Sequence, residues 1–187
     1  MKIAVFSDVH DNLVRWLEAV ETLKSEKIKI GICCGDIGEL QTLETVAQSL
    51  KTLYLALGNL DYKIKDKIDS GLPTSPRLHW TGRRNDKEEV KDSIGLFPEN
   101  VRATPDFGEV ELRGRKIAFA HNHYLGRQLA KSGKYDVVFY GHTHTPWEEK
   151  IGNTVLLNPG EISGQFGRAS FAIYDLKKMK AESKILE

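Results

Sequence analysis

The stretch KIAVFSDVHDN at residues 2–12 passes from an apolar run into a group of polar side chains. Residues 3–6 are typical of a short buried strand, and Asp8 and His10 follow directly after it. Asn12 is a residue type that caps helices, and apolar side chains recur behind it at helical spacing. These apolar positions are Leu13, Trp16, Leu17, Val20 and Leu23. The stretch therefore predicts a strand, a polar loop and a helix, in that order.

The same alternation continues through the first third of the chain. Residues 28–34 and 53–57 form two further apolar runs of strand length. Between them lies the apolar face of a second helix, marked by Leu43, Val46, Ala47 and Leu50. A β-α-β-α-β order with connections of this length predicts parallel strands joined by right-handed crossovers.

The second half of the chain is richer in strands than in helices. Residues 107–112 and 116–120 predict an antiparallel hairpin that turns through residues 113–115. Further strands are expected at residues 137–140, 154–157 and 170–174, with a last one near 183–186. We therefore expect an α/β chain of one domain, residues 1–187, in which two packed β-sheets are covered by helices.

Between the two halves, residues 63–102 show a less regular pattern, interrupted by Gly71, Pro73 and Pro76, with a charged run at residues 83–91. Charged runs usually face water, so we favour a solvated connection with a short helix, and a substrate-selecting cap is the alternative. His79 and Trp80 in this region are interpreted as packing residues.

The composition is that of an ordinary globular protein, with 40% hydrophobic and 28% charged residues among 187. Lys+Arg 27 against Asp+Glu 26 leaves a net charge of +1, which provides no broad basic surface for a stable nucleic-acid complex. No apolar segment is typical of a secretory signal or a membrane span. Cys33 and Cys34 are adjacent in a strand-like run, where a mutual disulfide would be strained. We therefore expect buried free thiols and a cytoplasmic location.

Five of the six histidines lie in three short stretches, each of which follows an apolar run. The stretches are Asp8-Val9-His10, His121-Asn122-His123 and Gly141-His142-Thr143-His144, with Gly35-Asp36 and Gly58-Asn59 between the first and the second. A parallel α/β sheet brings such loops together along one edge, where its active site usually lies. The sequence therefore predicts one site built from residues far apart along the chain.

The residue types in these stretches suit a pair of divalent metal ions. Carboxylates bind hard cations, and imidazole suits Mn, Fe, Ni and Zn. Two ions about 3.5–4 Å apart can hold a hydroxide between them and neutralise the charge that develops on phosphorus. Any single stretch could be an ordinary turn, but two histidines one residue apart after a buried strand seldom arise from packing, because an unpaired buried imidazole is costly. Together the stretches predict a metal-dependent phosphoester hydrolase.

These blocks, in this order, resemble those of the calcineurin-like metallophosphoesterases. The short chain most resembles the small YfcE-like phosphodiesterase branch, through SDVHDN at residues 7–12, GNLD at 58–61 and LNPGE at 157–161. The resemblance implies a four-layer α/β/β/α sandwich with two packed mixed β-sheets. Such a fold agrees with the strand-rich second half.

The resemblance also implies a role for each metal ligand. Asp8, His10 and His144 are expected to bind the first of two divalent ions. Asn59, His121 and His142 are expected to bind the second. Asp36 is expected to bridge them, and the ions are expected to be Mn²⁺ or Ni²⁺, with Fe or Zn²⁺ as alternatives. Because imidazoles bind metal only when neutral, activity should fall in acid.

The expected reaction is in-line attack on a phosphoester by a metal-bridging hydroxide. Many relatives have a histidine after the asparagine of the third block, which protonates the leaving alkoxide, and this chain has Leu60 there. Two residues could replace it: His123, which we favour, and Asp61, which could instead orient a ligand histidine. We therefore expect His123, Asp61 and Asn59 to be the catalytic residues, with Asn59 also among the metal ligands. A missing acid predicts faster turnover of aryl or nucleotide esters than of alkyl esters.

The segment at residues 158–161, Asn-Pro-Gly-Glu, has two interpretations. It could contact phosphate or support the site, and a simple turn is equally well favoured, because Asn, Pro and Gly form turns readily. Tyr124, Arg127 and Arg168 are further candidates for substrate contact, and the sequence does not rank them.

Other functions of the same fold stay open. A retromer subunit that resembles these enzymes works chiefly as a protein-binding scaffold, and a phosphomonoesterase or protein phosphatase is a third class. A complete set of metal ligands favours the enzyme. We expect a small phosphodiester as substrate and no membrane partner. The oligomeric state stays open, with a homodimer through exposed C-terminal strands as a plausible assembly.

Overall fold

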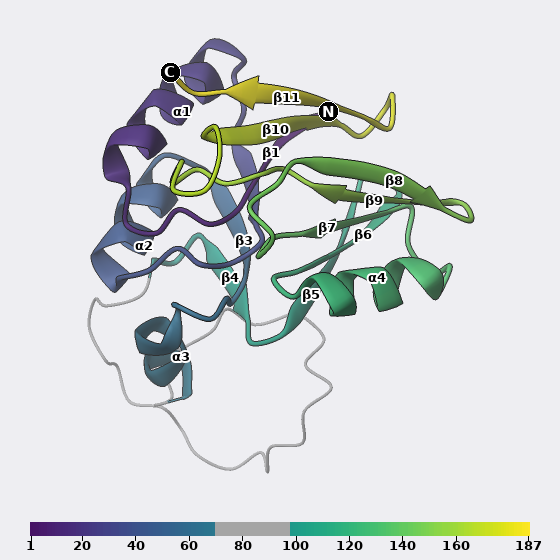
Figure 1. Cartoon of the computed structure of the whole chain (residues 1–187), viewed down its shortest axis with the longest axis horizontal. Helices are drawn as coiled ribbons and strands as arrows, with labels where there is room; N and C mark the ends of the chain where they lie inside the picture. Colours follow the sequence, from purple (N-terminus) through teal and green to yellow (C-terminus); the bar gives the residue numbers. More distant parts are fainter. Residues whose placement is uncertain (70–97) are drawn as a thin grey trace.

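Residues 1–69 and 98–187, which the computed structural model describes, form two β-sheets that pack face to face (Figure 1). The first sheet contains β1 (Lys2–Phe6), β2 (Ile30–Cys33), β3 (Thr52–Ala56), β4 (Val101–Thr104), β10 (Ser170–Asp175) and β11 (Lys180–Ile185). The second sheet contains β5 (Phe107–Leu112), β6 (Arg115–Ala120), β7 (Val137–Tyr140), β8 (Trp147–Ile151) and β9 (Thr154–Asn158). The helices are α1 (Leu13–Ser25), α2 (Leu40–Gln48), α3 (Tyr62–Asp69) and α4 (His123–Lys131).

In the first sheet the strand order is β11-β10-β1-β2-β3-β4. Strands β1 to β4 are parallel, and β10 and β11 add to the edge of β1 as antiparallel neighbours. The β-α-β-α-β order predicted for the first third is thus confirmed. The carboxyl ends of β1, β2 and β3 consequently meet along one edge of the sheet.

The second sheet has the order β5-β6-β7-β9-β8. Strands β6, β7 and β9 are parallel, whereas β5 and β8 pair antiparallel at the two edges. The predicted hairpin is present, with Phe107 opposite Ala120. Both sheets are therefore mixed.

Alternate side chains of a strand point to opposite faces, and β1 shows how this builds the layers. Phe6 packs against Trp16 of α1, with ring centroids 4.7 Å apart, whereas its neighbour Val5 lies among Phe119 and Phe139 of the second sheet. A third apolar cluster joins the outer face of the second sheet to Ala130 of α4. Figure 1 shows α1 and α2 on one side of the sheets and α4 on the other. The predicted α/β/β/α sandwich is confirmed.

Some local predictions were wrong or incomplete. Leu17 lies outside the apolar face of α1 and is 55% exposed, because the face that packs is formed by Trp16, Ala19, Val20 and Leu23. Strand β8 was not predicted, since its sequence WEEKI has the charges of an exposed edge strand. Helix α4 was also missed, although Asn122 caps it by accepting hydrogen bonds from two backbone N–H groups.

The irregular region between the halves is only partly described. Its start belongs to α3 and its end to β4, which extends the first sheet. Residues 70–97, and with them the charged run at 83–91, His79 and Trp80, lie outside the described residues.

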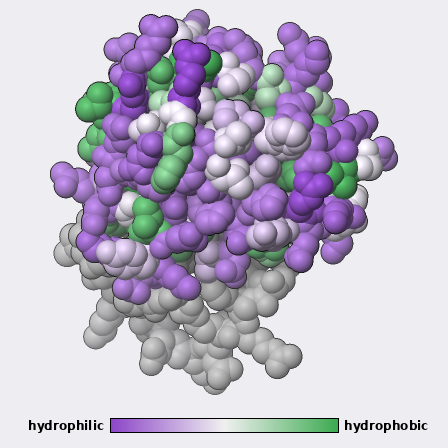
Figure 2. All heavy atoms as spheres, viewed as in Figure 1, coloured by the Kyte–Doolittle hydropathy of each residue, from purple (hydrophilic) through white to green (hydrophobic). Residues whose placement is uncertain are grey.

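The two cysteines are buried and free, as expected. Cys33 faces the helices and Cys34 faces the second sheet, and burial raises the pKa of both thiols well above the usual value. The face in Figure 2 is mostly hydrophilic, with hydrophobic residues in small separate groups. No helix in the described ranges is long and apolar enough to cross a membrane.

Candidate metal centre

The polar residues singled out in the sequence lie where strands end. Asp8 and His10 follow β1, Asp36 follows β2, and Asn59 follows β3. His121 follows β6, while His142 and His144 follow β7. All of these strands run parallel within their sheets, so their carboxyl ends supply the loops of one site.

Asp8, His10 and His144 form the first group of side chains that could hold a metal ion. Oδ1 of Asp8 lies 3.4 Å from Nε2 of His144 and 3.7 Å from Nε2 of His10. Asp8 is fully buried, and neither its Oδ1 nor Nε2 of His10 makes a hydrogen bond within the described part of the chain. Buried polar atoms normally have a partner, so this orphaned pair fits a cation between them.

Asp36 stands between the first group and His121. Its Oδ2 lies 3.7 Å from Nε2 of His10 and 3.5 Å from Nε2 of His121. Its Oδ1 is 2.9 Å from the backbone N–H of Leu60, which donates to it. Asp8, Asp36 and His121 are all buried, and they form a second group that could hold an ion.

His142 and Asn59 complete the side of the centre that faces solvent. Nδ1 of His142 lies 3.1 Å from Nε2 of His121 and 3.5 Å from Nδ2 of Asn59. Both His142 and Asn59 are exposed, whereas Asp8 and His121 are buried. All seven residues that the sequence assigned to metal binding are thus linked by short contacts, and the centre opens to solvent beside this pair.

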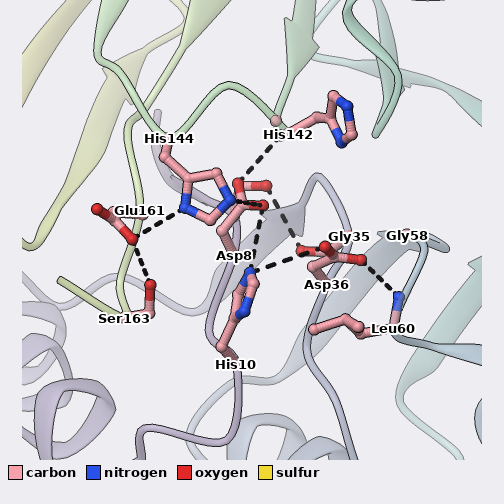
Figure 3. Close-up of polar contacts among 12 residues, drawn as sticks. Asp8, His10, Gly35, Asp36, Gly58, Leu60, His142, His144, Glu161 and Ser163 are labelled. Atoms are coloured by element: carbon pink, nitrogen blue, oxygen red, sulfur yellow. Dashed lines mark hydrogen bonds and ion pairs between the residues drawn. The ribbon is translucent and has the colours of Figure 1, made fainter. Parts of the chain in front are cut away.

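Two of the imidazoles are oriented by hydrogen bonds at Nδ1. Nδ1 of His121 lies 2.8 Å from the carbonyl oxygen of Cys34, and Nδ1 of His144 lies 2.9 Å from Oε2 of Glu161. Since both partners only accept, each Nδ1 carries the proton, and each Nε2 presents its lone pair to the carboxylates of the centre. Figure 3 shows Glu161 and Asp8 on opposite sides of the His144 ring.

The backbone at the centre adopts a conformation that side chains disfavour. Five of the seven residues have positive φ: Asp8 (54°), His10 (47°), Asp36 (53°), His142 (71°) and His144 (57°). Non-glycine residues rarely adopt this left-handed region, and such strain concentrates at functional sites. The strain points to a site whose geometry is fixed by function rather than by stability.

The glycines before Asp36 and Asn59 allow their loops to approach each other closely. A Cβ on Gly58 would lie 2.1 Å from Oδ1 of Asp36, and a Cβ on Gly35 would lie 2.7 Å from Nδ1 of His121. The glycines in these two dipeptides are therefore required by packing at the centre, beyond their tendency to form turns.

Asp61 lies behind the centre and supports its loops. Its buried carboxylate accepts hydrogen bonds from the backbone N–H groups of Asp36 (2.9 Å), Gly38 (3.0 Å) and Gly58 (2.7 Å). Burial raises the pKa of Asp61, and the hydrogen bonds from Gly38 and Gly58 oppose that shift. The contacts of Asp61 thus join the loops that present Asp36 and Asn59, rather than orienting a histidine.

His123, at the start of α4, makes contacts of another kind. Its ring centroid lies 4.6 Å from that of Tyr124 and 5.8 Å from that of Tyr140. Leu60, at the position where many relatives have a histidine, is 42% exposed. Arg127 forms an ion pair with Glu149, so its guanidinium is already engaged.

Glu161 supports the site, one of the roles that the sequence left open for residues 158–161, but its contact with His144 was not predicted. Its fully buried carboxylate accepts from His144, from the hydroxyl of Ser163 and from three backbone N–H groups of residues 165–167. Burial would raise the pKa of Glu161, yet these hydrogen bonds lower it to about 2. The sequence signal for this role was the acidic residue directly after Asn-Pro-Gly. A simple turn does not need a carboxylate at that position, and burying one is costly unless it has hydrogen-bond partners.

Comparison with known proteins agrees with this geometry. A family model described as the calcineurin-like phosphoesterase superfamily domain matches residues 1–179. A phosphodiesterase from Methanocaldococcus jannaschii is 30% identical over 190 residues, covering 100% of both chains. The phosphodiesterase YfcE from Escherichia coli is 33% identical over 82 residues, covering 43% of this chain and 42% of its own length. A solved archaeal phosphodiesterase superimposes with a TM-score of 0.76 at 27% identity, covering 100% of both chains.

The chain belongs to the calcineurin-like phosphoesterase superfamily, as its sequence motifs had indicated. It is a metal-dependent phosphoesterase, and its centre contains groups of side chains suited to divalent ions.

Proposed function

We propose that the centre binds two divalent ions and hydrolyses a small phosphodiester. The observation that carries this proposal is the position of Asp36, whose Oδ2 lies within 3.7 Å of Nε2 of His10 and 3.5 Å of Nε2 of His121. One carboxylate oxygen between imidazoles from two loops is the arrangement expected of a bridging ligand. The full-length relative named a phosphodiesterase supports the substrate class.

Each of the other ligands belongs to one ion in this proposal. Asp8, His10 and His144 bind the first. Asn59, His121 and His142 bind the second. The amide nitrogen of Asn59 now faces His142, and rotating the amide group by half a turn places its oxygen there to bind the metal. When bound, such a pair of ions supplies a hydroxide nucleophile at neutral pH and neutralises charge on the phosphate.

The chain's own contribution is to hold these ligands in place. The backbone N–H of His142 donates to Oδ2 of Asp8 at 3.1 Å, which leaves Oδ1 of Asp8 free to bind metal. Asp61 fixes the loops of Asp36 and Asn59 through backbone hydrogen bonds. His123 is our candidate for the group that protonates the leaving oxygen, because it lies two residues beyond His121, at the start of α4. Mn²⁺ or Ni²⁺ suits this mixture of imidazole and oxygen ligands, with Fe or Zn²⁺ as alternatives.

The test uses protein stripped with a chelator and reloaded with Mn²⁺, Ni²⁺, Zn²⁺ or Mg²⁺. Each form is assayed on bis(p-nitrophenyl) phosphate and on p-nitrophenyl phosphate, a diester and a monoester with the same leaving group. We expect the diester to react faster, and the Asp36→Asn variant to lose this activity. The Asp66→Asn variant is the matched control, since Asp66 is an exposed aspartate on α3.

Three results would contradict the proposal. Metal binding without turnover would favour a protein-binding scaffold. Faster turnover of the monoester would favour a phosphomonoesterase. Full activity in Asp36→Asn would exclude Asp36 as an essential ligand.

A further inference from the structure

A pocket of about 330 Å³ borders the metal centre at His144. It lies between the loop of residues 163–169, the connection from β7 to β8, and β11. His144 forms part of its wall, so one ring separates the pocket from the metal-binding atoms. The volume is at the small end of the range for ligand pockets, which suits one ring system rather than a long chain.

The surface of the pocket is largely apolar, although polar side chains also border it. Phe166, Pro146 and Ile185 line it, and Arg168 adds a positive charge at its wall. Phe166 is 77% exposed, an unusual degree for a phenyl group. With Pro146 and Ile185 it forms an apolar surface beside the metal centre, and such surfaces line most ligand pockets.

The loop that presents Phe166 is held by a buried charge. The carboxylate of Glu161 accepts from the backbone N–H of Phe166 at 2.8 Å and of Gly167 at 2.6 Å. The Phe166 ring also packs edge-on against His144, with centroids 4.7 Å apart. Phe166 is thus exposed but fixed in position, as expected of a side chain that is pre-organised for binding.

We propose that this pocket binds a planar aromatic group esterified to the phosphate, with Phe166 as the residue that recognises it. The inference rests on the proposed function, because it takes the phosphoryl group to lie at the metal centre. A flat ring can pack against the Phe166 phenyl and the Pro146 ring, which aliphatic groups fill less well. Arg168 suits the anionic charge that every phosphodiester has.

The test measures binding rather than turnover, with phosphonates that the enzyme cannot hydrolyse. Phenylphosphonate, cyclohexylphosphonate and methylphosphonate are titrated into Mn²⁺-loaded protein by calorimetry. We expect phenylphosphonate to bind about tenfold more tightly than methylphosphonate, and cyclohexylphosphonate to lie between them. The Phe166→Ala variant should reduce the phenyl-to-methyl ratio below about threefold, and Phe166→Tyr should restore it.

The Leu17→Ala variant is the control, since Leu17 is an exposed apolar side chain on α1, outside the pocket. Its ratio should equal that of the wild type. An unchanged phenyl-to-methyl ratio in Phe166→Ala would contradict binding of the aromatic group at this pocket. Equal affinity for the phenyl and cyclohexyl compounds would contradict a preference for aromatic groups. Failure of all three phosphonates to bind would instead contradict the proposed function, because methylphosphonate needs only the metal centre.

Discussion

The Glu161 carboxylate lies 2.9 Å from Nδ1 of His144, and the two side chains point toward each other (Figure 3). Because the carboxylate accepts at Nδ1, the lone pair of Nε2 is directed toward Oδ1 of Asp8, 3.4 Å away. A buried charge thereby fixes the tautomer and the orientation of one expected metal ligand. The same carboxylate organises the loop that presents Phe166, so two parts of the site share one support.

We expect Glu161→Gln to weaken metal binding by about 10- to 100-fold, because the neutral amide holds the His144 tautomer less firmly. Calorimetric titration of chelator-treated protein with Mn²⁺ would measure the change. Ser163→Ala is the matched control, since it removes one hydrogen bond from Glu161 and leaves its charge in place. Equal losses in both variants would show that Glu161 acts through loop packing rather than through His144.

Stability should depend on pH through the same residue. The pKa of Glu161 is lowered from 4.5 to about 2 in the folded protein, so the stabilisation is present above pH 4.5 and is lost as pH falls toward 2. The difference corresponds to roughly 3 kcal/mol. Urea unfolding of the metal-free protein at several pH values would measure it. Glu161→Gln should show a shallower loss in acid, and a parallel pH profile in that variant would contradict the assignment.

Asp61→Asn should destabilise the fold by about 1–3 kcal/mol, because the amide cannot accept from all three backbone N–H groups that Asp61 now satisfies. Metal affinity should fall in parallel, since these hydrogen bonds hold the loop of Asp36. Chemical denaturation and Mn²⁺ titration would measure the two effects. The exposed Asp66→Asn change should alter neither. Normal stability with lost activity would instead place Asp61 in the chemistry.

Leu60 leads to a prediction about leaving groups. Without a histidine at this position, an alkoxide departs with less help, so rates should rise steeply as the leaving-group pKa falls. A series of phosphodiesters whose leaving groups range from aryl to alkyl would give the slope of rate against leaving-group pKa. Leu60→His should make it shallower, since Leu60 is exposed and a polar side chain of similar size fits there. Equal rates across the series in the unaltered protein would contradict this prediction and would mean that His123 fully replaces the missing histidine.

The sequence predicted the fold well because its apolar runs are long and regular. The strand before Asp8 and the hairpin at residues 107–120 appear as expected, since strand spacing and turn residues agree there. Strand β8 was missed because an exposed edge strand needs no apolar pattern. Leu17 was placed on the wrong face because an apolar side chain at helical spacing need not be buried.

The convergence of the seven side chains was predictable, because polar residues of these types at the ends of parallel strands meet at one edge. What surrounds these side chains was not, because hydrogen bonds between distant loops leave no local pattern. Glu161 reaches His144 from 17 residues away, and Asp61 reaches Gly38 from 23 residues away. Phe166 likewise shows no local pattern in the sequence, because its neighbours His144 and Ile185 are close to it only in space.

The most direct test of the central claim is the number of metal ions that the chain binds. Chelator-treated protein would be loaded with Mn²⁺, freed of excess ion by gel filtration, and analysed for metal and protein together. We predict two ions per chain in the wild type and fewer than two in Asp36→Asn, because Asp36 contacts histidines of both groups. One ion or none in the wild type, or two in Asp36→Asn, would contradict a shared pair of metals.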